Sequence, residues 1–135
     1  MLLSIGSVLA GFLFIAIGVN AANVPLRRMM PQAFEANGGT HDTTALLISF
    51  VAVAVFAIAG SYLTARLAPN RPMRHALILA ACGLVFNVTA AAMTWGYWPA
   101  WYTLVSLALV IPYGWLGGRL RERQLEGTMA RPALV

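Results

Sequence analysis

Apolar residues along the chain are gathered into four long runs separated by polar segments. The runs cover residues 2–24, 45–63, 76–94 and 101–118, and none of them contains Asp, Glu, Lys or Arg. An α-helix rises about 1.5 Å per residue, so roughly twenty such residues cross the ~30 Å hydrocarbon core of a bilayer. The pattern therefore predicts an all-α protein, a four-span transmembrane helix bundle.

The predicted spans take up more than half of the chain and leave no room for a separate soluble domain. We therefore expect residues 1–135 to form a single integral membrane domain, with an outer loop at residues 25–44 and a cytoplasmic tail at residues 119–135. The segment Val19-Asn20-Ala21 satisfies the small-residue rule for cleavage of a secretory signal. However, nothing basic precedes the first run, and that run is longer than the usual core of a signal, so we interpret it as a helix.

The outer loop carries apolar residues at helical spacing. They predict an amphipathic helix lying on the membrane surface, and they are Leu26, Met29, Met30, Ala33 and Phe34. Pro31 argues against one continuous helix and is suited to begin a second, short one. Asn37-Gly38-Gly39 then predicts a turn, and either Thr40 or Asp42 is expected to cap the second span.

Composition and charge fix the class and suggest an orientation. The chain is 60% apolar and 10% charged, with a formal net charge of +5, whereas soluble domains average about 25% charged residues. Most arginines lie on one predicted side of the membrane, where they would set the topology and contact lipid headgroups. That side has Arg66, Arg71, Arg74, Arg119, Arg121, Arg123 and Arg131, and the other side has Arg27 and Arg28. The positive-inside rule then places both termini in the cytoplasm of a bacterial inner membrane. A nucleic-acid partner is not expected, because no stacking aromatics interleave these arginines.

Two helix ends have similar sequences, "YLTARL" at residues 62–67 and "WLGGRL" at residues 115–120. Both predicted helices finish at the same interface, where an aromatic ring sits at headgroup depth and an Arg one turn later reaches the phosphates. Two explanations remain open. Interface anchoring alone would produce the same ending twice, or the chain would be two tandem helical hairpins related by an axis along the membrane normal.

Small residues at helical spacing predict where the helices pack, because they allow close backbone approach in a bilayer. They lie at Ser7, Gly11, Gly18 and Ala22 in the first span, Ala57 and Ser61 in the second, and Gly114 and Gly118, in line with Ser106 and Val110, in the fourth. Pro112 is expected to kink the fourth helix near Ala108. Polar residues within the spans are expected to form interhelical hydrogen bonds, as Asn20, Asn23, Asn87, Thr89 and Ser106. The alternative for Asn87 is that it lines a polar path.

The connection between the third and fourth spans, "TWGYWPAWYT", is rich in aromatic residues and uncharged. It contains Trp95, Tyr97, Trp98, Trp101 and Tyr102. Trp and Tyr favour membrane interfaces, so one interpretation is an aromatic belt around a tight turn. The other is a docking edge for a protein partner, a lipid or a pigment tail.

Several chemical functions are excluded by what the spans lack. No carboxylate lies in the apolar cores, whereas exporters of the small multidrug resistance type depend on one. Cys82 is the sole cysteine, which excludes disulfide exchange within the chain. His41 and His75 are expected on opposite sides of the membrane, which excludes a shared metal or haem. We therefore expect no enzyme activity and no cofactor.

The runs "GSYLTARLAPNRPMRHALILAACGLV", "PAWYTLV" and "PYGWLGGRLRER" together resemble small four-helix inner-membrane proteins of bacteria that mostly carry no assigned function. The resemblance begins near Gly60 and implies topology only. We expect an accessory or scaffold subunit of a larger membrane assembly, such as a respiratory or photosynthetic complex, whose partners are membrane lipids and other subunits or further copies of itself. The alternative is a small oligomeric transporter or channel.

Overall fold

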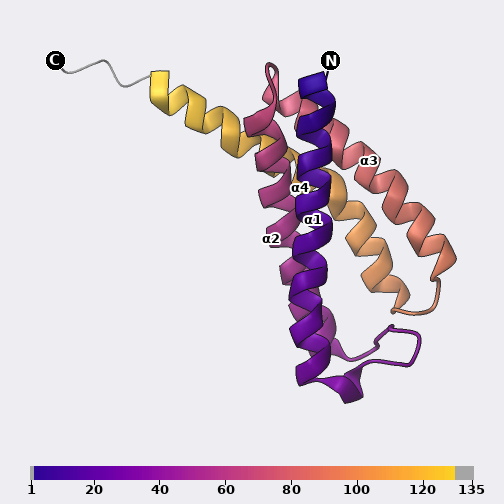
Figure 1. Ribbon diagram of the computed structural model, residues 1–135. Coiled ribbons are helices and arrows are strands. Elements are labelled where there is room, and N and C mark those ends of the chain that lie inside the picture. Colours follow the sequence, from indigo (N-terminus) through magenta and orange to yellow (C-terminus); the bar gives the residue numbers. More distant parts are fainter. Residues whose placement is uncertain (1, 130–135) are drawn as a thin grey trace.

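The fold is a bundle of long helices (Figure 1). A computed structural model describes residues 2–129 and, over that range, contains α1 (Leu2–Met29), the 3-10 helix η1 (Pro31–Ala33), α2 (Thr43–Leu67), α3 (Pro72–Met93) and α4 (Ala100–Met129), with no strand. Each of the four α-helices is long and apolar enough to cross a membrane. The predicted all-α, four-span architecture is confirmed, and it indicates a multi-pass membrane protein.

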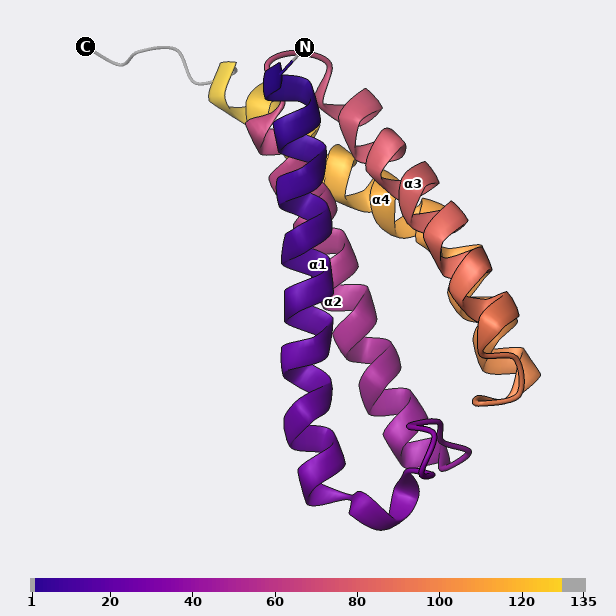
Figure 2. The same ribbon diagram turned by 45° about the vertical axis from the view of Figure 1, so that its right-hand side comes forward.

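The helices form two hairpins, α1 with α2 and α3 with α4. The hairpins meet mainly where α2 packs on α4, whereas α1 approaches α3 much less closely. Figure 2 shows that the hairpins are close together at one end and diverge toward the other. We name the first the arginine-rich end, since it holds the start of α1, the α2–α3 turn and the last part of α4. The second, the loop end, holds residues 30–42 and residues 94–99.

Glycines allow the close packing at the arginine-rich end. A Cβ atom on Gly11 of α1 would lie 2.7 Å from the carbonyl oxygen of Gly60 in α2. One on Gly117 of α4 would lie 2.6 Å from the Ile58 carbonyl oxygen. The helix backbones therefore touch where side chains are missing, which is the usual way that helices associate in lipid.

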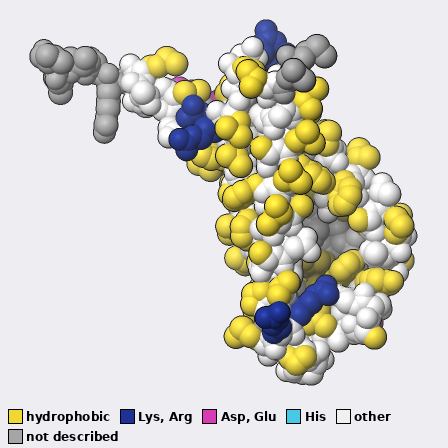
Figure 3. All heavy atoms as spheres, in the orientation of Figure 1, with side chains coloured by type: hydrophobic (Ala, Val, Ile, Leu, Met, Phe, Trp, Pro, Cys, Tyr) yellow, Lys and Arg dark blue, Asp and Glu magenta, His cyan; other side chains and the backbone are white. Residues whose placement is uncertain are grey.

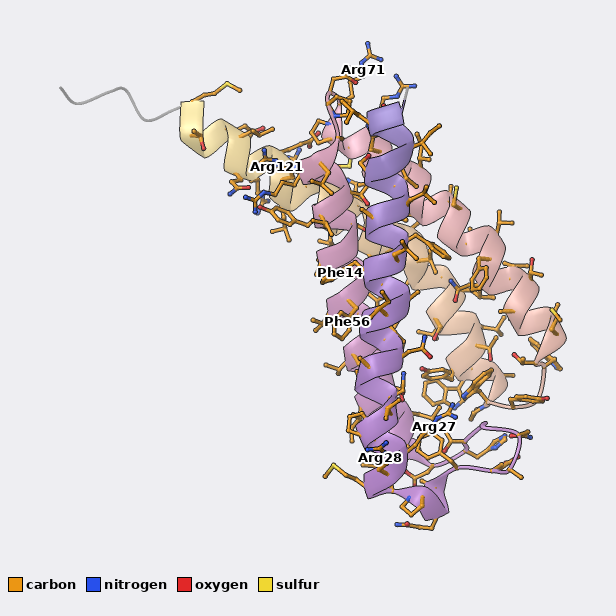
Figure 4. The ribbon with its side chains drawn as sticks, viewed as in Figure 1. Phe14, Arg27, Arg28, Phe56, Arg71 and Arg121 are labelled. Atoms are coloured by element: carbon orange, nitrogen blue, oxygen red, sulfur yellow. The ribbon has the colours of Figure 1, made fainter. Side chains whose placement is uncertain are left out.

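The glycines singled out from the sequence lie at helix contacts. Gly18 of α1 faces the ring of Phe56, and that ring also lies 6.0 Å from the ring of Phe14 (Figure 4). In α4, Gly114 faces Ala76 and Ala80 of α3, and a Cβ on Gly118 would lie 2.7 Å from the Met73 sulfur.

The similar helix ends at residues 62–67 and 115–120 lie against each other. A Cβ on Gly117 would lie 2.7 Å from the backbone nitrogen of Tyr62. Near the same place the hydroxyl of Tyr62 donates a 2.6 Å hydrogen bond to Gln124. The similarity thus coincides with a direct contact between α2 and α4. Duplication of a hairpin stays a prediction.

Several element boundaries differ from the prediction, and the ends of the first and fourth helices differ most. The first helix does not end at residue 24 but continues through Pro25 to Met29, so Leu26 and Met29 belong to α1 and no separate surface helix forms. The break comes at Met30, with φ −128° and ψ 56°. A residue that precedes proline is driven out of the helical region, so Pro31 ends α1 and begins the three-residue η1.

The expected tail from residue 119 is instead helical as far as Met129. Its charged residues are good helix formers, and Arg119 pairs with Glu122 at 3.5 Å across one turn. Figure 1 shows α4 bending along its length, so that this last part leaves the bundle. Pro112 lies inside α4 and removes one backbone donor, which accounts for the bend. Arg131 lies outside the described residues.

Candidate functional site: the cleft between the hairpins

The divergence of the two hairpins leaves a cleft, which we name the interhairpin cleft. It consists of an outer chamber of about 450 Å³ toward the loop end and a deep chamber of about 350 Å³ nearer the arginine-rich end. α2 and α4 form its back wall, and Figure 3 shows the surface hollowed between α1 and α3. The two chambers share lining residues from all four helices, namely Val19, Asn20, Val53, Asn87 and Ser106.

The outer chamber is lined by apolar side chains together with many polar ones. Its polar lining residues are Asn20, Asn23, Arg27, Thr40, Ser49, Asn87, Thr94, Tyr102, Thr103 and Ser106. Polar side chains are costly in hydrocarbon and almost always face the protein interior or a water-filled cavity. Each of the four helices therefore contributes polar residues to one space, which is suited to water or to a polar ligand.

Asn23 links the two helices of the first hairpin. Its amide nitrogen donates to the Val19 carbonyl at 2.9 Å, and its amide oxygen accepts a 2.9 Å hydrogen bond from the hydroxyl of Ser49. One side chain thus connects α1 to α2 beside the cleft, as the sequence predicted for polar residues in the spans.

Asn20 and Asn87 differ from that expectation. Each amide nitrogen donates within its own helix, Asn20 to the Ala16 carbonyl at 2.8 Å and Asn87 to the Gly83 carbonyl at 2.7 Å. Among residues 2–129 neither amide forms an interhelical hydrogen bond. Each therefore offers an amide oxygen and one N–H to the cleft. We name Asn20, Asn87 and Ser106 the polar waist, because they line both chambers.

Arg27 lies where the outer chamber reaches the loop end. Its guanidinium donates a 3.1 Å hydrogen bond to the Gly38 carbonyl and lies 5.3 Å from the centre of the Phe34 ring. Gly38 has φ +84°, a conformation that glycine adopts without strain. Figure 4 shows Arg27 directed to the side of α1 that faces α4, while Arg28 lies on the front of the helix. The loop thus holds one guanidinium at the mouth of the cleft.

The loop between α1 and α2 covers the loop end of the cleft. The backbone N–H of Thr40 donates to the Tyr97 carbonyl at 2.9 Å, and the Thr40 hydroxyl donates to the Ala33 carbonyl at 2.5 Å. Asp42, one of the two expected caps, accepts a 2.9 Å hydrogen bond from the Ala45 N–H at the start of α2. The loop is therefore anchored to its own hairpin and to the other one.

The structure divides the five aromatic residues of the α3–α4 connection. Trp98 and Tyr102 line the outer chamber, and the Tyr102 ring lies edge-on to Phe50 of α2 at 6.1 Å. Trp95 is 62% exposed and Trp101 is 50% exposed. Trp95 and Trp101 are therefore the most outward-facing candidates for a docking edge, whereas Trp98 and Tyr102 contribute to the cleft.

Sequence reasoning missed most of the cleft, although a signal was present. Asn20, Asn23 and Arg27 follow each other at spacings of three and four residues, which places them on one face of a helix. The predicted end of the first span at residue 24 separates Arg27 from the two asparagines, whereas α1 in fact continues to Met29. No pattern in the sequence points to Ser49, because its hydrogen bond to Asn23 depends on how α1 and α2 pack.

Other chemical groups lie away from the cleft. His41 pairs with Glu35 at 3.1 Å in the exposed loop, whereas His75 lies at the arginine-rich end, where its Nδ1 is 3.2 Å from the Arg71 carbonyl oxygen. Cys82 is exposed on α3. Within residues 2–129 no group of three His, Cys, Asp or Glu residues could hold a metal ion.

Comparison with protein-family models, with curated proteins and with solved structures finds no match to this chain. The function is therefore inferred from the geometry of the cleft.

Proposed function

We propose that this protein binds a small molecule in the interhairpin cleft and carries it across the membrane as a small, non-catalytic transporter. The observation that supports the proposal is that polar side chains from all four helices line one cleft. Polar side chains that face a shared cavity instead of lipid, with Arg27 at its mouth, are suited to line the path of a polar solute. Transporters also commonly bind their substrates between structural units that move against each other.

The two ends of the cleft differ in a way that suits alternating access. The arginine-rich end is closed by a backbone contact between the hairpins, where Gly117 of α4 lies against Ile58 and Tyr62 of α2. The loop end is covered by a loop whose backbone bond to the second hairpin runs from Thr40 to Tyr97. Rocking of one hairpin against the other, about the contact between α2 and α4, would open one end as the other closes.

The orientation of the protein in the membrane is part of the same proposal. Six described arginines lie at the arginine-rich end and two, Arg27 and Arg28, at the loop end. By the positive-inside rule the arginine-rich end faces the cytoplasm of a bacterial inner membrane, with both termini on that side. The wider, loop-covered end of the interhairpin cleft then faces the outside.

Thiol labelling tests whether the cleft is wet. In a Cys82→Ser background, a Ser106→Cys thiol at the polar waist should react with a membrane-impermeant maleimide added on the loop-end side. Leu104→Cys is the matched control, because Leu104 lies on the same helix and is 58% exposed outside the cleft. A thiol reacts as its thiolate, which needs water. Equal rates for the two thiols in vesicles would contradict a wet cleft.

The same thiol distinguishes transport from binding alone. A transporter opens to both sides in turn, so Ser106→Cys should also be labelled when the reagent is added to inside-out vesicles. Labelling from the loop-end side only would leave a binding protein and remove the transport proposal.

The exposure of Trp95 and Trp101 favours a second candidate, the accessory or scaffold subunit. Two large aromatic side chains at an end of the bundle, 62% and 50% exposed, could seat a neighbouring membrane protein. In that case the cleft would be an incidental gap. The labelling experiments and the tryptophan substitutions described below separate the two candidates.

A further inference from the structure

As far as the structure describes the chain, the cleft lining carries positive charge and no negative charge. Of the residues that line the two chambers, Arg27 is the only charged one in the described chain. No carboxylate of residues 2–129 pairs with it. A cation would therefore meet an unbalanced positive charge, whereas an anion would be attracted.

Arg27 has further N–H donors that can bind such an anion. A guanidinium carries five N–H donors, and the structure uses one of them for the Gly38 carbonyl. The contacts to Gly38 and to the Phe34 ring hold the group at the mouth. A pre-positioned guanidinium suits bidentate binding of a phosphate or carboxylate.

The deep chamber is lined by no charged residue of the described part of the chain. Besides the polar waist and Ser61 it is lined mainly by apolar and aromatic residues, namely Phe12, Ile15, Ala16, Ala57, Leu79, Ala80, Phe86, Val110 and Tyr113. Its volume of about 350 Å³ lies within the usual range for ligand pockets, about 300–1,000 Å³. From the loop end inward, the cleft thus offers a positive charge, then neutral hydrogen-bonding groups, then an apolar chamber.

The side of the cleft faces the bilayer. α1 and α3 approach each other little, and the surface is hollowed between them (Figure 3). The rings of Phe12 and Phe86 meet edge-on at 5.6 Å across this gap beside the deep chamber. The gap is therefore narrowed there and wider toward the loop end. An amphiphile already in the loop-end leaflet could move sideways into the cleft without leaving the membrane.

We propose that the ligand of the interhairpin cleft is an anionic membrane lipid from the loop-end leaflet. Its phosphate binds Arg27, its glycerol and ester groups lie at the polar waist, and an acyl chain occupies the deep chamber. The order of the three chemistries along the cleft is the order of the groups in such a lipid. The inference rests on the proposed function, since it names the substrate class of that same cleft.

Protection of the thiol at position 106 tests the inference with defined probes. In detergent, palmitoyl lysophosphatidate should slow maleimide labelling of Cys82→Ser/Ser106→Cys. Arg27→Gln should raise the concentration needed for half protection about tenfold or more, because it removes charge-assisted hydrogen bonds. Arg28→Gln, the neighbouring arginine directed elsewhere, is the control and should change that concentration less than twofold. Arg27→Lys keeps the charge and should restore part of the loss.

Two further probes identify the source of the anion and the role of the charge. Monopalmitoylglycerol, which has the same chain and no phosphate, should protect much less well than lysophosphatidate. Inorganic phosphate at the same concentration should not protect, because it lacks the chain. Equal protection by the neutral lipid, equal effects of Arg27→Gln and Arg28→Gln, or full protection by phosphate alone would each overturn the anionic lipid. Labelling without protection would also overturn it while leaving the wet cleft in place, whereas a thiol that never reacts would overturn the proposed function itself.

Discussion

The backbone N–H of Thr40 donates a 2.9 Å hydrogen bond to the carbonyl of Tyr97, and this bond joins the loop of the first hairpin to the turn of the second. Thr40 is 2% exposed, so the bond is shielded from solvent. A single hydrogen bond contributes about 0.5–1.5 kcal/mol net. At the loop end this bond is accompanied by packing of Gly39 against the backbone of Tyr97, whereas at the other end Gly117 of α4 packs against the backbone of α2.

The first prediction concerns orientation. Reporter fusions at Asn70 and after the last residue should report the cytoplasm, because the arginine-rich end carries most of the positive charge. A fusion at Asn37, an exposed position in the outer loop, should report the outside. A cytoplasmic signal at Asn37 would show that the orientation is inverted.

The second prediction concerns the closed end. Gly117→Leu should lower the stability of the bundle by about 1–3 kcal/mol or more, because a side chain there overlaps the backbone of α2. Gly6→Leu is the matched control, since nothing lies within 4 Å of a Cβ at that position. Thermal unfolding in detergent measures both. Equal melting temperatures would mean that α2 and α4 do not meet at Gly117.

The third prediction concerns the hydrogen bond between Asn23 and Ser49. A double-mutant cycle with Asn23→Ala and Ser49→Ala should give a coupling energy of about 0.6 kcal/mol and at most ~2 kcal/mol, the range for such bonds between helices in membranes. The same cycle with Asn20→Ala and Ser49→Ala should give a value near zero, because Asn20 bonds within its own helix. Coupling energies of similar size in both cycles would mean that the substitutions destabilise the hairpin as a whole and that the bond between Asn23 and Ser49 contributes nothing specific.

The fourth prediction separates docking from ligand binding. If the protein is an accessory subunit, Trp95→Ala/Trp101→Ala should release partners that co-purify from native membranes, whereas Trp98→Ala should retain them. Trp98 lines the outer chamber, and the other two face outward. Insertion is checked separately by membrane fractionation. Retention of every partner by the correctly inserted double variant would remove the docking candidate.

How much was predictable depends on how local each feature is. The four spans were predictable because hydrophobicity acts on each helix separately. The ends of the spans were less predictable. α1 continues past Val24 and ends only before Pro31, and α4 continues through charged residues that also favour a helix. Partner identity, orientation and the scaffold role are untested and stay predictions.

The cleft depends on which faces of four helices meet, and no single stretch of sequence encodes that. Asn87 is an example. Its position near the middle of an apolar run suggested either an interhelical bond or a polar path, and only the positions of α1 and α4 place it beside Asn20 and Ser106. The aromatic connection shows the same limit, because its rings form one cluster in the sequence, whereas in the fold Trp98 and Tyr102 line the cleft and Trp95 and Trp101 are exposed.

The polar waist takes Asn20 from the first hairpin and Asn87 and Ser106 from the second, so the separation of Asn20 from the other two changes when the hairpins shift relative to each other. Occupancy of the cleft and the angle between the hairpins are then thermodynamically linked. A ligand that fits one arrangement better shifts the population toward it, by no more than the difference in its affinity for the two arrangements. The link is reciprocal. A neighbouring protein or lipid that presses the hairpins together at the loop end changes the affinity for the ligand by some factor, and the ligand changes the affinity for that neighbour by the same factor.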